Sequence, residues 1–189
     1  MPRRPGLDQA NVVEAAAKLI DEEGITQLSL GHLAERLGVR TPSLYNHIAG
    51  LPGLKRDLAL YCLRDILDRI TRATIGKSRE EAIFAFVSAC RAYAVANPGR
   101  YALTVQSPDP EDQEMQMVSQ RIIEVIQAIL APYRLSDQDS IHAIRSLRSI
   151  VHGFTSLEAA GAFAIPVDLD ASLHWMVNLF IAGLKEVPQ

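Results

Sequence analysis

The sequence predicts an all-α fold of about nine helices, in which a long helix joins a small N-terminal domain to a larger helical body. Three observations support this prediction. Apolar residues recur at intervals of three and four along most of the 189 residues, which is the spacing of an amphipathic helix. Glycine, proline and capping residues separate these periodic stretches, and none of them looks like a convincing strand. Aromatic residues make up only 6% of the chain, while Ala and Leu are abundant, as suits an all-helical protein.

The stretch from Ser29 to Ile48 reads as two short helices separated by a tight turn. Ser29 is placed to cap the first helix, and Gly38 to end it in the left-handed conformation. We expect Thr41 to cap the second helix, with Pro42 at its first helical position. Its outward side chains carry hydroxyl, phenol, amide and imidazole groups: Thr41, Ser43, Tyr45, Asn46 and His47. Such groups suit base edges and phosphates in a DNA major groove, which predicts a helix-turn-helix whose second helix contacts DNA.

The same residues resemble the signature of the tetracycline-repressor (TetR) family. The resemblance rests on the runs LAERLGV (33–39) and PSLYNHI (42–48), and it extends over about residues 10 to 60. It implies DNA contacts by Thr41, Pro42, Ser43, Tyr45, Asn46 and His47. The chain departs from the family at Leu51, where a phosphate-binding lysine is common, and at Gly31, where many members carry a long side chain.

Basic residues surround the predicted DNA-contacting helix although the net charge of the chain is −3. Those expected to contact DNA are Arg3, Arg4, Arg40, Lys55 and Arg56, the last two in place of the missing lysine. Arg36 lies nearby, and the acidic residues 21–23 lie on the preceding helix. Such segregation can build a basic face on an acidic protein. Solvated charges without a partner, and a merely solubilising N-terminal arm, are the alternatives.

We divide the chain at residue 50. Residues 1–50 are the predicted helix-turn-helix DNA-binding domain, and residues 51–189 the helical domain for effector binding and dimerisation. Outside the motif, helices are expected over residues 8–23, 50–74, 79–97, 100–106, 114–130, 136–160 and 170–186.

The family resemblance implies a small-molecule effector held between the long helix and its neighbours. Methionine and aromatic residues concentrate in these middle helices, and they suit an adaptable cavity. The residues predicted to line it are Leu63, Leu67, Phe86, Cys90, Tyr93, Tyr101, Met117 and Phe154. The alternative is an ordinary hydrophobic core.

The segment 147–163, LRSIVHGFTSLEAAGAF, resembles the C-terminal regulatory domain of a TetR branch that has a His-Gly-Phe run. Together with the last helix, it is too apolar to face water on every exposed side. This favours a homodimer in which two helices of each copy form a four-helix bundle. Its predicted interface consists of Phe154, Leu157, Gly161, Leu173, Met176, Val177, Phe180 and Leu184.

No cofactor, metal site or enzymatic activity is predicted, because no nucleophile elbow, phosphate loop or metal-binding motif occurs. One stripe of a predicted helix carries His142, Arg145, Arg148 and His152, but it lacks the further ligands that a metal site needs. We interpret it as polar residues on an interface or helix flank. The alternative is that Arg145 or Arg148 binds an anionic effector or a partner carboxylate. Cys62 and Cys90 are expected to be buried free thiols. Without a signal peptide or an apolar span, the expected location is the cytoplasm.

These features predict a ligand-responsive homodimeric transcriptional regulator, a repressor that a small molecule releases from a near-palindromic DNA operator. One alternative is a dimeric small-molecule-binding protein of the same fold with weak or lost DNA binding, which Leu51 and Gly31 would explain. A small helical enzyme is the other, and the missing motifs argue against it.

Overall fold

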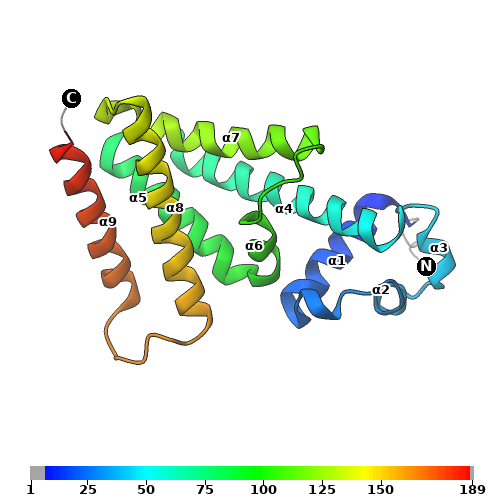
Figure 1. Cartoon of the computed structure of the whole chain (residues 1–189). Coiled ribbons are helices and arrows are strands. Elements are labelled where there is room, and N and C mark those ends of the chain that lie inside the picture. Colours follow the sequence, from blue (N-terminus) through cyan, green and yellow to red (C-terminus); the bar gives the residue numbers. More distant parts are fainter. Residues whose placement is uncertain (1–6, 188–189) are drawn as a thin grey trace. The chain divides into compact units, whose positions relative to one another are not determined.

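The computed structural model describes residues 7–187, and within them it contains nine α-helices and two short 3-10 turns, with no strand (Figure 1). The all-α prediction is therefore confirmed. Arg3 and Arg4, which the sequence assigns to DNA contact, lie outside the described residues. Among those residues, no helix combines the length and the apolar character that crossing a membrane requires.

Among the described residues, the first compact unit contains residues 7–64 together with residues 97–106. Its helices are α1 (Gln9–Glu23), α2 (Leu30–Leu37), α3 (Thr41–Leu44), the first part of α4 (Gly50–Thr74) and α6 (Pro98–Thr104). One hydrophobic core joins α1 to α4 and includes Leu19, Leu33, Leu44, Leu54 and Leu58, each fully buried.

The start and the end of α2 are the ones that the sequence predicts. The Ser29 hydroxyl accepts a hydrogen bond from the His32 amide at 3.2 Å, which satisfies one of the unpaired amides of the first turn. Gly38 ends the helix at φ 67° and ψ 33°, in the left-handed region that glycine adopts without steric cost.

The predicted start of α3 is wrong by one residue. Thr41 is the first residue of the helix and Arg40 precedes it as the N-cap, with no side-chain capping bond. The reason is that the Arg40 carbonyl already accepts from the Ser43 amide at 2.8 Å, which brings Thr41 into the first turn. The α-helix ends at Leu44, and a turn in which the Leu44 carbonyl accepts from the His47 and Ile48 amides follows it.

The second compact unit contains residues 65–96 and 107–187. It holds the rest of α4 and the helices α5 (Arg79–Ala96), α7 (Gln113–Leu130), α8 (Asp137–Ala159) and α9 (Leu169–Glu186). α5 packs against α7, α8 and α9, and its buried residues include Ile83, Phe86 and Tyr93. Ser136 caps α8, as predicted, by accepting from the Asp139 amide at 3.1 Å.

Candidate nucleic-acid interface

The helix α3 and the turn after it, residues 41–48, present polar side chains over two buried anchors. Leu44 is fully buried and Ile48 is 6% exposed, and both belong to the core of the first unit. Tyr45, at 60% exposed, and Asn46 point to solvent, whereas His47 is half-buried. The predicted separation of inward and outward positions is therefore present for Leu44, Tyr45 and Asn46. Among the other predicted DNA contacts, Pro42 is exposed and Thr41 and Ser43 are half-buried.

The turn between α2 and α3 is fixed by backbone hydrogen bonds. The Gly38 amide donates to the Glu35 carbonyl and the Val39 amide to the Ala34 carbonyl, both at 3.0 Å. Val39 is partly buried against the same core, so α3 leaves the turn in a direction set by packing. A short helix that is fixed at both ends can hold its outward side chains in one arrangement.

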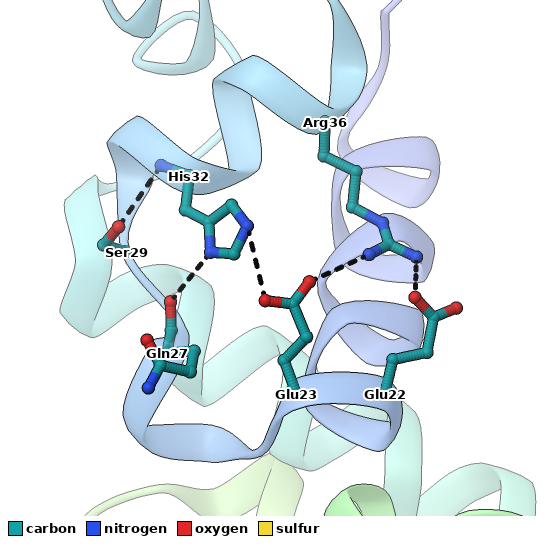
Figure 2. A network of polar contacts seen from close by, with 6 residues as sticks. All are labelled: Glu22, Glu23, Gln27, Ser29, His32 and Arg36. Atoms are coloured by element: carbon teal, nitrogen blue, oxygen red, sulfur yellow. Dashed lines mark hydrogen bonds and ion pairs between the residues drawn. The ribbon is translucent and has the colours of Figure 1, made fainter.

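A polar network fastens α2 to the end of α1 (Figure 2). Arg36 donates to Glu22 and, at 3.3 Å, to Glu23. The His32 ring lies between the Gln27 carbonyl, at 3.4 Å from Nδ1, and the Glu23 carboxylate, at 3.5 Å from Nε2. The network opposes the charge of Arg36 with two carboxylates, so Arg36 contributes less to a basic face than its place in the sequence suggests.

The predicted phosphate-contacting residues that the structure describes are all exposed. They are Arg40, immediately before α3, and Lys55 and Arg56, in the second turn of α4. Arg56 also lies 3.5 Å from the carboxylate of Asp57, which is half-buried. Leu51 is half-buried against the core, which explains why an apolar residue occupies the position of the family's lysine.

α6 belongs to the same unit and packs against the end of α1. The Arg100 amide donates to one carboxylate oxygen of Asp21 at 2.9 Å, and its guanidinium donates to the other. Gly99 lies so close to α1 that an added Cβ would be 2.1 Å from the Ile20 carbonyl oxygen. Nothing in the sequence pattern signalled this contact, because the two segments lie 79 residues apart.

The residues predicted to line an effector pocket are divided between the two units, with Leu63 and Tyr101 in the first. In the second unit, Phe86, Cys90, Tyr93 and Phe154 are buried, Leu67 is half-buried, and Met117 is 60% exposed. The Arg69 guanidinium lies 5.3 Å from the centre of the Tyr93 ring. Burial raises the pKa of the Cys90 thiol to about 12, so this cysteine is an inert core residue.

The second unit has a groove of about 670 Å³ between α5 and α9, lined by none of the predicted pocket residues. Phe84 of α5 stacks on His174 of α9, with ring centres 4.3 Å apart. Arg91 of α5 donates two hydrogen bonds to Glu158, at 2.8 and 2.7 Å, and a third to Asp170. These hydrogen bonds lower the pKa of Glu158 and raise that of Arg91.

The residues predicted for the dimer interface differ in their exposure. Phe154, Leu173, Val177 and Leu184 are buried within their own unit, so they offer little surface to another chain. Leu157 is 48% exposed, Gly161 is exposed, and Met176 and Phe180 are half-buried.

The predicted interface list omits Trp175 and Leu179 of α9, which are 65% and 54% exposed. The apolar pattern of α9 could have identified both residues, because a helix that is apolar on all sides exposes apolar residues opposite its buried stripe. On the exposed sides of α8 and α9, Gly153 and Gly183 have open space where a Cβ would project. The stripe of His142, Arg145, Arg148 and His152 is exposed, and no group of potential metal ligands forms within residues 7–187.

Comparison with known proteins agrees with this architecture. Residues 12–47 match the family model for bacterial regulatory proteins of the tetR family, and residues 83–180 match that for the tetracyclin repressor-like C-terminal domain. The chain is 35% identical over 185 residues to the HTH-type transcriptional regulator YobS of Bacillus subtilis, covering 97% of this chain and 96% of that protein. It is 32% identical over 180 residues to the regulator Rv0681 of Mycobacterium tuberculosis, covering 95% and 82%.

Solved structures show the same fold. A TetR variant from Acinetobacter baumannii in complex with minocycline aligns with a TM-score of 0.70 at 23% identity, covering 97% of this chain and 99% of that chain. The helix-turn-helix geometry, the two family models and the relatives matched over nearly the whole chain agree, and this protein belongs to the TetR family of helix-turn-helix transcriptional regulators.

Proposed function

We propose that the protein is a homodimeric repressor that binds a near-palindromic DNA operator and leaves it when a small molecule binds. The observation that carries the proposal is the display of Tyr45 and Asn46 in the turn directly after α3, a segment anchored by Leu44 and Ile48. Short side chains with amide, phenol and imidazole groups can bond to base edges and phosphates, whereas an ordinary solvent face carries mostly Lys and Glu.

In this proposal the side chains of residues 41–47 enter the major groove. Arg40, Lys55 and Arg56 are exposed around them and contribute phosphate contacts, as do Arg3 and Arg4 of the N-terminal arm. Each neutralised phosphate releases condensed counterions, so operator affinity should fall steeply as the salt concentration rises.

The exposed faces of α8 and α9 support a homodimer. Trp175 and Leu179 expose large apolar surfaces on α9, and Leu157 does so on α8. Gly153 and Gly183 lie inside helices, where glycine costs about 1 kcal/mol relative to alanine, and nothing in their own chain requires them. Glycines that face open space allow the backbones of two partner helices to approach closely, so we assign these faces to a two-fold interface.

The effector acts in this proposal by population shift. A ligand of the second unit changes the spacing of the two DNA-contacting helices only if it binds one arrangement more tightly than the other. A differential of a few kcal/mol is enough to release an operator. The residues proposed to contact it are the members of the predicted set that lie in the second unit, including the buried Phe86 and Tyr93.

Selection of bound duplexes from a random DNA pool tests the proposal. We expect a near-palindrome with half-sites about one helical turn apart, or a multiple of that distance. The control is Tyr45→Ala, in which an exposed side chain is removed and the core is unchanged. Recovery of unrelated sequences by the unaltered protein would instead favour a ligand-binding protein that has lost DNA recognition.

A further inference from the structure

Arg91 of α5 joins the end of α8 to the start of α9. Its guanidinium donates two hydrogen bonds to Glu158 and a third to Asp170. Glu158 lies in the last turn of α8, and Asp170 lies in the first turn of α9. One side chain from a third helix therefore bonds to both helices at the points where the exposed linker 160–168 leaves α8 and enters α9 (Figure 1).

The contact between Arg91 and Glu158 is the more constrained of the two. Both side chains are shielded from solvent, at 20% and 18% exposed, whereas the side chain of Asp170 is 82% exposed. Two parallel hydrogen bonds between a guanidinium and a carboxylate fix direction as well as distance. The end of α8 is also the negative end of its dipole, where a cation is favourable, and Arg91 supplies that cation.

The Arg91 guanidinium also lies over an aromatic cluster that includes the linker. Its central carbon is 5.6 Å from the centre of the Phe154 ring, which is a cation–π distance. Phe154 of α8 is buried, and its ring lies 4.9 Å from that of Phe163 in the linker. Apolar contacts therefore support the charged ones at this end of the two helices.

Two side chains of the two-fold interface assigned above lie close to these contacts. Leu157 on α8 immediately precedes Glu158, and Trp175 on α9 lies five residues after Asp170; both are exposed. Five residues are about one and a half turns of a helix, so the position of Trp175 follows that of Asp170. The distance between Leu157 and Trp175 therefore depends on the contacts that Arg91 makes with both helices.

We propose that Arg91 is a positioning residue for the homodimer, which holds Leu157 and Trp175 in the arrangement that a second copy of the chain fits. This proposal rests on the dimer put forward above. Arg91 is mostly shielded and bonded within its own unit, so it acts through α8 and α9 and not by contact with the other copy. Loss of its contacts leaves both helices formed, but their exposed faces lose their fixed spacing.

The fluorescence of Trp175, the single tryptophan of the chain, measures dimer formation in the test. Burial of an exposed indole between two copies shifts its emission to shorter wavelengths, so a dilution series gives the dimer dissociation constant. We expect Arg91→Gln to raise this constant about tenfold. Arg72→Gln is the matched control, because Arg72 forms an exposed pair with Asp68 within α4 of the same unit, and it should leave the constant unchanged.

A second pair of variants makes the test independent of the stability of the fold. Asp170→Asn changes an exposed carboxylate and keeps the Arg91–Glu158 pair, and we expect it to raise the dissociation constant about two- to fivefold. Asp68→Asn makes the same change in the control pair and should have no effect. Far-UV circular dichroism at the same concentrations checks that all variants keep their helices.

A double-variant cycle distinguishes positioning from a general loss of stability. Trp175→Ala removes a side chain that Arg91 is proposed to position, and sedimentation equilibrium then replaces fluorescence as the measure of the dimer. In the Trp175→Ala background, Arg91→Gln should raise the dissociation constant less than about threefold, because part of what it positions is absent. An equal factor in both backgrounds would show that Arg91 does not act through Trp175.

The outcomes separate this inference from the proposed dimer. A dimer whose dissociation constant is the same for Arg91→Gln and Arg72→Gln would overturn the role of Arg91 and leave the dimer intact. A light-scattering mass of one chain at every concentration, with Trp175 emission that does not change on dilution, would overturn both.

Discussion

Arg100 binds the carboxylate of Asp21 with both its backbone amide and its guanidinium, although 79 residues separate them in the sequence. The two side chains are 17% and 10% exposed, so the pair is shielded from solvent. The contact makes α6 part of the same compact unit as the helix-turn-helix. The stability of the DNA-contacting unit therefore depends on a segment far outside the motif.

Removal of one partner of this pair should destabilise the first unit. Asp21→Asn removes the carboxylate charge from a shielded ion pair, which we expect to cost roughly 2–3 kcal/mol of unfolding free energy. Urea denaturation of Asp21→Asn, Arg100→Gln and the double variant gives the coupling between them. Additive effects would mean that the two residues do not stabilise each other.

Gly99 should tolerate no side chain. In Gly99→Ala the added Cβ would meet the Ile20 carbonyl oxygen at 2.1 Å, so α6 must move away from α1. We expect a loss of about 1–3 kcal/mol in unfolding free energy. Gly31→Ala is the matched control, because Gly31 lies in α2 with no atom near its Cβ position. It should leave stability unchanged or raise it by up to about 1 kcal/mol.

Within residues 41–48, changes to the buried anchors and changes to the outward side chains should have different effects on stability and on DNA binding. Leu44→Ala removes a fully buried side chain and should cost about 2–5 kcal/mol of stability. Asn46→Ala removes an exposed one and should change stability by less than about 0.5 kcal/mol while weakening operator binding. Thermal unfolding and DNA titration of both variants check this. Undiminished operator binding by Asn46→Ala would remove that residue from the interface.

The Arg91–Glu158 pair should contribute to stability in a pH-dependent manner. Hydrogen bonds from Arg91 lower the pKa of Glu158 in the folded state. Its contribution is therefore complete above the unfolded-state pKa of glutamate, about 4.3, and is lost as the pH falls through the lower folded-state pKa. We expect Glu158→Gln to be less stable than the unaltered protein at pH 7, by roughly 1–2 kcal/mol, and the difference to shrink in acid. A difference that is constant from pH 7 to pH 3 would exclude this ionisation as its source.

Local signals predicted much of the fold. Ser29, Gly38 and Ser136 mark helix ends because capping and left-handed backbone depend on neighbouring residues. The predicted N-cap, Thr41, lies one residue after the observed one, since either Arg40 or Thr41 could supply the carbonyl that starts the helix. The exact first and last residues of a helix depend on small differences of this kind in backbone hydrogen bonding.

Contacts between distant segments were not predictable from one sequence. The sequence places Arg36 among the basic residues near the DNA-contacting helix, whereas in the structure it binds Glu22 and Glu23. The apolar pattern of α9 identified a helix with too much apolar surface, but it did not distinguish Leu173, which its own unit buries, from Trp175, which it leaves exposed. Packing determines which side of a helix is buried, and the composition of the helix alone does not reveal that side.

The most direct test of the central claim is a titration of the protein against its selected DNA duplex, measuring affinity and stoichiometry together. The account predicts two protomers per duplex, affinity that falls steeply with salt, and a large loss when either half-site is scrambled or Tyr45 is changed to alanine. Binding of equal strength to a scrambled duplex, unaffected by Tyr45→Ala, would contradict the assignment of residues 41–47 to operator recognition.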